Sequence, residues 1–500
     1  MAIFKKNELP LLSYIATLNY INPFTANRIE LEKKILHSEF ISHGKVWNNT
    51  SSSDSRINQK KIATITFELL KVIDGRLNQG IYPEDSEFEI YESFIVYYLF
   101  EKYRDKFSST VNAPKPDFSF YRSFAEDVDF FLHLPGHRPL PCNYSAPHLF
   151  SMFFQIYRAF HFIFKFLIGS SSAAAQLRAD IWESLFTCDI KRYQRSMYLR
   201  MQDISTLITG PSGSGKEVVA RAIAYCAYIP FSAPKLSFLV DYKQQYYPLH
   251  LAAMPSNLIE SELFGHRKGA FTGAIQNRVG WLEQVSEYGS VFLDEIAEIP
   301  HDIQVKLLRI LQYRTFQSLG DCLDKTFKGR IIAATNKDLA LEISQGLFRE
   351  DLYYRICSDK IFTPPLKKLI NASKDELFNL IVFVAEKIID SNEANALANE
   401  ALSWICKNLG LNYDWPGNFR ELEQCVRNIL IKGNYVPPVI IDNSVNSLEN
   451  QIYNGNFTAE ELIAKYCSII YEKNGSYIET SKILNLDRRT VKNKINLNNK

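Results

Sequence analysis

A glycine-rich stretch that ends in one lysine, Gly210 to Lys216, has the residue types and spacing of a phosphate-binding loop. Its letters, GPSGSGK, fit the pattern G-x-x-x-x-G-K. Glycines let successive backbone N–H groups approach a phosphate without an intervening Cβ, and a helix that begins at the lysine adds its positive end. Glu217 follows, where a Ser or Thr that binds Mg²⁺ commonly stands. We expect phosphate contacts from Gly210, Pro211, Ser212, Gly213, Ser214, Gly215, Lys216 and Glu217.

The residues on either side favour this interpretation over a glycine-rich surface turn. Residues 204–209 are rich in β-branched side chains and predict a buried strand, and the Ala- and Val-rich residues after Lys216 predict a helix. The order strand, glycine loop, helix is the context that a phosphate loop requires.

Two carboxylates follow a second apolar run, Val291 to Leu293. At the carboxyl end of a parallel strand beside a phosphate loop, Asp294 would hold Mg²⁺ and Glu295 would orient or deprotonate the attacking water. A solvated strand end is the alternative. Another buried strand is predicted at 330–334, and its end brings two polar residues to the same edge of the sheet, Thr335 and Asn336.

A glycine-rich loop follows a helix that is predicted at 257–263. Its sequence is GAFTGA, from Gly269 to Ala274, and the glycines prevent the helix from continuing. Phe271 stands between glycines in an exposed loop, which suggests contact with another molecule. A loop that folds back on its own core is the alternative.

Arg349 and Arg355 lie six residues apart in the helix-like run FREDLYYRI. Arginines there could reach a γ-phosphate bound to a neighbouring subunit, or they could pair with Glu350 and Asp351 on a surface. Helices are expected next at 374–389, 395–409 and 418–432, with Arg420 in the first turn of the last one.

The last block of the chain predicts a helix-turn-helix with a basic second helix. It begins with a Thr-x-x-Glu capping pattern at 458–461, and shorter helices are expected at 477–484 and 488–496, with Asp487 as N-cap. A basic helix without a partner is the alternative. The expected DNA-contacting residues are Arg488, Arg489, Thr490, Lys492, Asn493 and Lys494.

The whole chain has 500 residues and a formal net charge of +2, which fits several folded domains and excludes a strongly polybasic binder. Its eight cysteines lack the close spacing of a zinc site, and no signal peptide is visible, so we expect a reducing, cytoplasmic setting.

One stretch, 149–168, is nearly as apolar as a membrane segment. Gln155, Arg158 and Lys165 share one helical face within it, so an amphipathic helix packed on protein is the favoured interpretation. A helix on a membrane surface is the alternative.

These motifs give a family resemblance from about residue 166 to residue 500. The chain resembles the bacterial enhancer-binding proteins, AAA+ activators of sigma-54 RNA polymerase typified by nitrogen regulatory protein C. GAFTGA is close to diagnostic, and GPSGSGKE, FLDEI, AATN, FREDLYYR and WPGNFREL occur in the family's order. The C-terminal NGSYIETSKILNLDRRTVKNKI looks like the family's Fis-type DNA-binding module.

The resemblance implies ATP and Mg²⁺ as cofactors and a homo-oligomeric ring, commonly a hexamer. Thr335 and Asn336 would act as sensor I, and Arg420 would act as the sensor II arginine. Arg349 and Arg355 would be arginine fingers of the adjacent subunit. In this family Glu217 after the loop lysine is usual. The residues implied to touch sigma-54 are Gly269, Ala270, Phe271, Thr272, Gly273 and Ala274.

Three features depart from the family pattern. His250 stands where the family usually has an Asn that couples the catalytic glutamate to the loop, so protonation would make this coupling pH-sensitive. Two stretches are longer than usual, 187–202 and 228–248, and the second is expected to loop out before a strand at 249–252. The N-terminal part does not resemble a receiver domain.

The predicted fold is multidomain: a central AAA+ α/β P-loop domain with a parallel sheet and a helical lid, a C-terminal all-α helix-turn-helix, and an N-terminal α-rich or α+β regulatory domain. The expected function is ATP-dependent activation of sigma-54 RNA polymerase from upstream DNA sites, without a membrane. The alternatives are a DNA-binding regulator or repressor whose AAA+ module serves assembly alone, and an AAA+ remodeller of another protein. The expected divisions are 1–165 regulatory, 166–366 AAA+ α/β, 367–433 lid, 434–457 linker and 458–500 helix-turn-helix.

Overall fold

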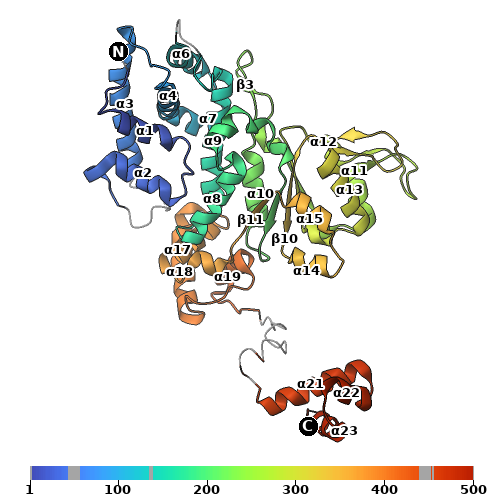
Figure 1. The fold of residues 1–500 in the computed structure, drawn as a ribbon. Coiled ribbons are helices and arrows are strands. Elements are labelled where there is room, and N and C mark those ends of the chain that lie inside the picture. The colour runs from blue at the N-terminus through green and yellow to red at the C-terminus, as the bar shows by residue number, and fades with distance from the viewer. Residues whose placement is uncertain are drawn as a thin grey trace. The chain divides into compact units, whose positions relative to one another are not determined.

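The computed structural model describes residues 3–42, 57–134, 139–438, 452, 455 and 457–498. The chain forms two compact units, 1–435 and 436–500 (Figure 1). The predicted divisions at 165/166 and 366/367 fall inside the first unit, and they stay predictions. Most of the predicted linker, 434–457, lies outside the described residues.

Helices are the only regular secondary structure in the described N-terminal residues, which confirms the α-rich alternative. Its long central helix, α7 (Ala146–Phe166), is buried along most of its length, so packing on protein is confirmed for the apolar stretch. Among the described residues, no helix combines the length and apolar character that crossing a bilayer needs. The other helices before the sheet are α1 (Leu9–Leu18), α2 (Ala26–Leu36), α3 (Ile57–Asn78), α4 (Phe88–Lys102), α5 (Arg104–Asn112), α6 (Tyr121–Leu132), α8 (Ser172–Phe186) and α9 (Ile190–Arg195).

The centre of the first unit is a parallel sheet of five strands in the order β11-β1-β10-β7-β4. Parallel strands keep their carboxyl ends at one edge, so loops that follow different strands meet there. The strands are β1 (Thr206–Thr209), β4 (Tyr246–His250), β7 (Ser290–Asp294), β10 (Arg330–Thr335) and β11 (Asp359–Phe362). Predicted strands at 204–209, 291–295 and 330–334 are confirmed within a residue or two.

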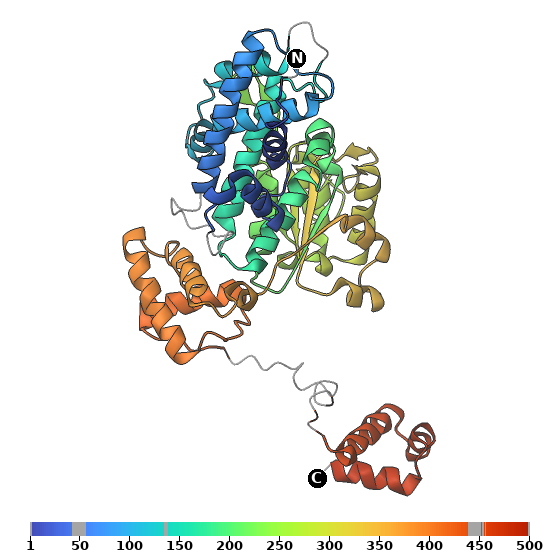
Figure 2. The same cartoon turned by 60° about the vertical axis from the view of Figure 1, so that its left-hand side comes forward.

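The two faces of the sheet belong to different hydrophobic cores. One face, with Ile208, Phe292 and Ile332, joins the phosphate-loop helix α10 (Lys216–Tyr225) and the N-terminal helices in one continuous core. Figure 2 shows these blue and cyan helices beside the sheet. The opposite face packs on α11 (Ser256–Phe264), α12 (Trp281–Gln284), α13 (His301–Tyr313), α14 (Leu339–Ser344) and α15 (Glu350–Ile356).

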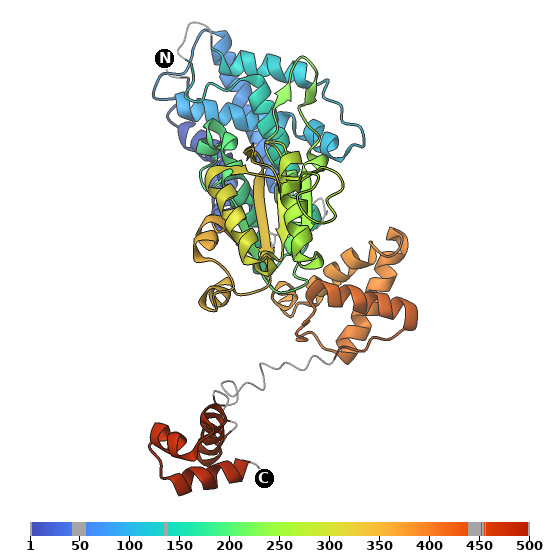
Figure 3. The ribbon, with the colours of Figure 1, turned by 90° about the vertical axis from the view of Figure 1, so that its right-hand side faces the viewer.

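The predicted lid is a separate helical core beyond the sheet, as Figure 3 shows in orange. Its helices are α16 (Leu366–Ile370), α17 (Lys374–Ala385), α18 (Ser391–Asn408) and α19 (Asn418–Lys432). All three helices that the sequence predicted here are present.

The 228–248 stretch does not loop out as predicted. It forms the hairpin β2 (Phe231–Ser232) with β3 (Ser237–Phe238), and then begins β4. The strand predicted at 249–252 is therefore present, but it starts three residues earlier, at Tyr246, and ends at His250. Phe231 and Phe238 pack on the rings of Phe150 and Phe154 in α7, and this apolar anchor explains why the stretch is ordered.

The second unit contains α21 (Ala459–Asn474), α22 (Tyr477–Leu484) and α23 (Arg488–Asn498). The Thr458–Glu461 capping box is confirmed: the Thr458 hydroxyl accepts from the Glu461 N–H at 3.3 Å, and the Glu461 carboxylate accepts from the Thr458 N–H at 2.8 Å. Asp487 caps α23 by accepting from the Arg489 N–H at 2.8 Å, as predicted. Cys467, Val491 and Ile495 form a small core between α21 and α23.

Candidate active site

The phosphate loop connects β1 to α10, the order that the sequence predicted. Gly213 and Gly215 take positive φ values of 73° and 93°, which other residues adopt at a cost. Gly210 packs so closely that an added Cβ would lie 2.2 Å from the Thr363 hydroxyl. These glycines hold the loop tight at the start of α10, where an anion meets the positive end of the helix.

Lys216 is buried at the first position of α10. Its Nζ donates to the carbonyl oxygens of Gly210 at 3.1 Å and Pro211 at 3.3 Å, and it lies 3.9 Å from Glu295 Oε1. Burial lowers the pKa of Lys216, while the charges of Glu295 and Asp294 oppose this shift. A partly desolvated ammonium is thus held beside the loop, where a phosphate would compensate its charge.

The two predicted carboxylates stand at the end of β7, next to β10. Glu295 has a left-handed backbone with φ of 55°, which turns the chain sharply after the strand. Its Oε2 accepts a hydrogen bond from the Asn336 N–H at 3.1 Å. Thr335 is buried and opposite Thr209 in the sheet, and its hydroxyl accepts from the Lys337 N–H at 3.1 Å. The structure therefore brings Asp294, Glu295, Thr335 and Asn336 to one edge.

His250 ends β4 beside the two carboxylates, but the carboxylate that it contacts is not the expected one. Its Nδ1 lies 3.1 Å from Asp294 Oδ2, whereas the family resemblance implied coupling to Glu295. The reason is register: His250 pairs directly with Asp294 across the two strands, and Glu295 lies beyond the pairing.

The start of α19 in the lid docks on the phosphate loop. Arg420 Nη1 donates to the Ser212 hydroxyl at 3.1 Å, which places the predicted sensor II arginine at the site. Asn418 Nδ2 donates to the Ser212 carbonyl at 2.9 Å, and the Phe419 N–H donates to the Gly213 carbonyl at 3.1 Å.

Two residues at this junction escaped the sequence reasoning, Asn418 and Thr363. The Thr363 hydroxyl lies 2.6 Å from that of Ser214. Asn418 stands inside the WPGNFREL motif beside Arg420, so the motif itself was a signal. Thr363 follows β11 without any motif, and only the sheet order shows its place.

The two candidate arginine fingers lie at the ends of the short helix α15. Arg349 pairs with Asp351 through Nε–Oδ1 at 2.9 Å and Nη2–Oδ2 at 2.6 Å, as the alternative allowed. Arg355 is exposed. Among the described residues of this single chain, neither arginine side chain forms a hydrogen bond or ion pair with the phosphate loop.

The GAFTGA loop projects between the short strands β5 (Gly265–His266) and β6 (Arg278–Val279). Its ends are joined by a hydrogen bond from the Gly269 N–H to the Ala274 carbonyl at 2.9 Å. Phe271 is 39% exposed and its ring centroid lies 5.0 Å from that of His266. The loop thus keeps a local contact while it presents the aromatic ring to solvent.

A second loop supports the first one. It links β8 (Thr315–Phe316) to β9 (Lys325–Thr326), and its Asp321 pairs with Arg267 at 2.8 Å. A Cβ on Gly320 would lie 2.9 Å from that of Ala270.

The basic face of α23 is exposed in the second unit. Lys494 is partly tied because its Nζ donates to Glu460 Oε1 at 2.7 Å. The exposed side chains are those of Arg488, Arg489, Thr490, Lys492 and Asn493. A surface of this kind suits phosphate and base contacts.

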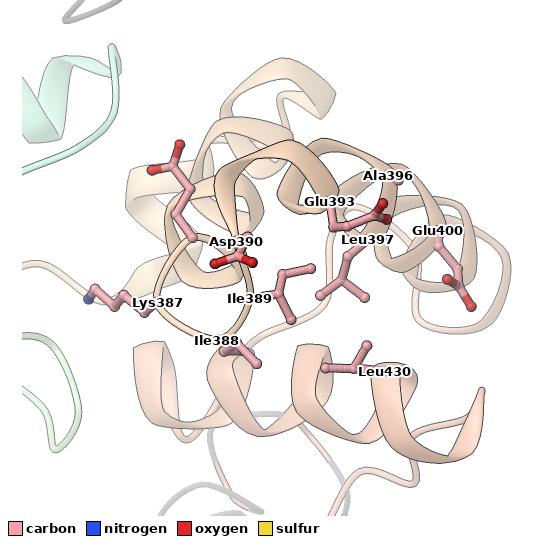
Figure 4. Close-up of a pocket in the computed structure, with 10 residues that line it drawn as sticks. Lys387, Ile388, Ile389, Asp390, Glu393, Ala396, Leu397, Glu400 and Leu430 are labelled. Carbon is pink, nitrogen blue, oxygen red and sulfur yellow. The ribbon is translucent and has the colours of Figure 1, made fainter.

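An open cavity of about 810 Å³ lies on the predicted lid, between the residues that follow α17 and the helices α18 and α19 (Figure 4). Its lining combines apolar side chains such as Ile389, Leu397 and Leu430 with acidic ones such as Asp390 and Glu400. None of its lining residues belongs to the phosphate loop or the carboxylate pair, so this cavity is not the nucleotide site.

The site residues fit a nucleotide with Mg²⁺. Mg²⁺ in phosphate-transfer sites takes one or two carboxylates and completes its shell with phosphates and water. Asp294 supplies one such carboxylate, and the described residues contain no cluster of three or more acidic, His or Cys ligands that would hold a metal alone.

Comparisons with known proteins agree with this geometry. Residues 189–361 match the family model of the sigma-54 interaction domain. The chain is 41% identical over 255 residues to the DNA-binding transcriptional regulator NtrC of Rhizobium meliloti (strain 1021), covering 50% of this chain and 48% of that protein. It is 40% identical over 265 residues to the anaerobic nitric oxide reductase transcription regulator NorR of Salmonella paratyphi C (strain RKS4594), covering 53% and 46%.

A solved structure of NtrX from Brucella abortus in complex with ATP is also similar, with 23% identity, coverage of 74% of this chain and 80% of that one, and a TM-score of 0.40. The chain spans about half the length of the curated relatives that it matches. The family match includes the phosphate loop, both carboxylates, the GAFTGA loop and the two α15 arginines. Residues 189–361 of this chain are therefore similar to the sigma-54 interaction domain, as their motifs predicted.

Proposed function

We propose that this chain is an ATP-driven transcription activator that acts on sigma-54 RNA polymerase from upstream DNA. The observation that carries the proposal is the convergence of Lys216, Glu295 and Arg420 on one phosphate loop, in a domain that also presents the GAFTGA loop. A regulator that used its AAA+ module for assembly alone would need neither the placed carboxylate nor the exposed loop.

Each residue has a proposed task in hydrolysis. Lys216 and the loop amides bind the phosphates, and Arg420 closes the lid over them. Bound Mg²⁺, held through Asp294, would neutralise phosphate charge. Glu295 accepts a proton from the attacking water, and the Asn336 N–H fixes one oxygen of this carboxylate at 3.1 Å.

The site is proposed to be shared between subunits. Arg349 and Arg355 do not reach the loop of their own chain, so they would serve the loop of the next copy in a ring, proposed to be a hexamer. For Arg349 this requires exchange of its pairing with Asp351 for a phosphate.

The remaining modules turn hydrolysis into remodelling. The exposed Phe271 and its neighbour Thr272 are proposed to touch sigma-54, and the nucleotide state is proposed to bias the position of their loop. The exposed basic face of α23 is proposed to hold the ring near the promoter, with a strong dependence on salt.

The test is promoter opening by purified protein with sigma-54 RNA polymerase and ATP. The wild-type chain should open promoter DNA, while Glu295→Gln should still bind ATP and hydrolyse it at least about 100-fold more slowly. Opening by Glu295→Gln at the wild-type rate would overturn the proposal, because remodelling would then not depend on hydrolysis.

A further inference from the structure

Helix α7 carries two long polar side chains, those of Gln155 and Arg158, that are fully buried. Gln155 is 1% exposed and Arg158 is 0% exposed. A buried arginine is costly unless its charge and its donors are matched. The hydrogen-bond partners of Gln155 and Arg158 therefore show which part of the chain this helix stabilises.

The partners are three successive carbonyls at the carboxyl end of the phosphate-loop helix. Arg158 Nη1 donates to the Tyr225 carbonyl at 2.9 Å, and Nη2 donates to the Ala227 carbonyl at 2.8 Å. Gln155 Nε2 donates to the Cys226 carbonyl between them at 2.8 Å. Carbonyls at a helix end lack partners within the helix, so α7 caps α10 from outside.

The charge of Arg158 matches the negative end of the α10 dipole. Arg158 has no ion pair among the described residues, and its guanidinium lies 5.1 Å from the Phe154 ring and 5.0 Å from the Tyr242 ring. Burial lowers the pKa of Arg158. The dipole, the two carbonyls, the two rings and the charge of Asp241 compensate this cation, while its buried Nε has no hydrogen-bond partner among the described residues.

The two unusually long stretches hold α7 in place. His148 Nε2 lies 2.9 Å from the Gln194 carbonyl in 187–202, and its Nδ1 lies 2.9 Å from the Tyr228 hydroxyl in 228–248. The hydroxyl of Tyr193 bonds Gln155 at 2.7 Å. The stretches 187–202 and 228–248 therefore form part of the interface between α7 and the core around the sheet.

We propose that Arg158 is a positioning residue for the nucleotide site, acting through α10. This helix of ten residues is about 15 Å long and has the phosphate loop at one end and Arg158 at the other. The N-terminal region then completes the ATPase module instead of being a detachable sensor, and a shift of α7 is passed to Lys216 along the helix. This inference rests on the proposed function, because one of the two measurements that test it is the affinity for nucleotide.

The experiment compares full-length Arg158→Met with Arg76→Met, a control in the same region. Arg76 is also engaged, with Glu8 at 2.7 Å and the Ile3 carbonyl at 2.6 Å, but its partners all lie in the N-terminal segment. We expect Arg158→Met to bind a fluorescent ATP analogue about tenfold more weakly and to exchange the amide hydrogens of 216–227 faster without nucleotide. Arg76→Met should lower the thermal midpoint and leave both readouts unchanged.

Arg158→Lys is the second variant, for the case that Arg158→Met does not fold. It keeps the cation but replaces the planar fork that reaches two carbonyls, so we expect about threefold weaker binding. Unchanged affinity and unchanged exchange in a folded Arg158 variant would overturn the inference, as would an equal loss of affinity in Arg76→Met. If the wild-type chain bound no ATP, the proposed function would fail, while the amide exchange would still test the cap.

Discussion

At the residue scale, Asn418 does more than its neutral side chain suggests. It has a left-handed backbone with φ of 53°, its Nδ2 donates to the Ser212 carbonyl, and its Oδ1 accepts from the Leu366 N–H at 2.8 Å. One amide therefore joins the phosphate loop, the start of the lid and the start of α19.

Replacing Asn418 should remove the hydrogen bonds that connect the phosphate loop to the lid. We predict that Asn418→Gly weakens nucleotide binding several-fold and lowers the free energy of unfolding by about 1–3 kcal/mol, because the buried Leu366 N–H and the Ser212 carbonyl both lose their hydrogen bonds. Asn418→Ala should cost about 1 kcal/mol more, since alanine resists the left-handed conformation. Denaturant unfolding and ATP titration measure both effects, and an Asn418→Ala variant as stable as wild type would refute this role.

The contacts of His148, which hold α7 against 187–202 and 228–248, make the stability of the fold depend on pH. Burial lowers the pKa of His148 below its usual value of 6.5, so the folded chain keeps it neutral where the unfolded chain binds a proton. Stability should therefore fall as the pH drops below about 6.5, by at most about 1.4 kcal/mol per pH unit for this one group.

The measurement is the difference in unfolding free energy between wild type and His148→Gln from pH 7.5 to 5. This difference isolates His148 from His161, whose pKa burial also lowers. The gap between the two proteins should narrow as the pH falls, and a gap that stays constant would show that His148 does not titrate as stated.

At the element scale, the GAFTGA loop depends on a neighbour that no motif marked. Gly320 has φ of 72° and meets Ala270 closely, whereas Gly346 has φ of 73° and nothing within 4 Å of the position of a Cβ. These two glycines share their backbone conformation and differ in their surroundings.

We therefore predict that Gly320→Ala impairs sigma-54 engagement while ATP hydrolysis stays within about twofold of wild type, because the added methyl displaces the loop tip and not the phosphate site. Gly346→Ala carries the same backbone cost of about 1 kcal/mol and should leave engagement intact. If Gly320→Ala and Gly346→Ala bound sigma-54 equally well, the close approach of Gly320 to Ala270 would not be needed to position the GAFTGA loop.

The elements that sequence could predict are those with a strong local pattern. The strand before the phosphate loop, the helix at 418–432 and the capping box at Thr458 all follow from periodicity and capping chemistry, and the structure contains them. The helix predicted at 374–389 is present as well, but it ends at Ala385. The sites at strand ends follow as well, because parallel strands put their polar ends together.

What sequence missed depends on contacts between distant segments. His250 meets Asp294 because of strand register, and Thr363 meets Ser214 because β11 is the neighbour of β1. The hairpin at 231–238 is too short to predict alone, and it is ordered by the rings of α7. The face of α7 that carries Gln155 and Arg158 was recognised, but only the fold shows that it caps α10.

At the scale of the whole molecule, the proposal requires more than one copy of the chain. We predict that Arg355→Ala binds ATP with an affinity close to wild type and loses hydrolysis by about 100-fold or more, since Arg355 serves a neighbouring site. Mixing Arg355→Ala with Lys216→Ala should restore part of the ATPase activity. The Arg355→Ala subunit supplies an intact phosphate loop, and the Lys216→Ala subunit supplies the arginine for that loop. No recovery on mixing, or full hydrolysis by a monomer, would contradict a shared site.

The central claim is that nucleotide energy moves the GAFTGA loop against sigma-54. Its most direct measurement is the binding of purified full-length chain to sigma-54 with ADP, with ATP and with a transition-state mimic of the γ-phosphate. We predict tight binding with the mimic, weak binding with ADP, and loss of binding in Thr272→Ala with ATP hydrolysis retained. Turnover of ATP by the wild-type chain without sigma-54 binding in any nucleotide state would contradict it.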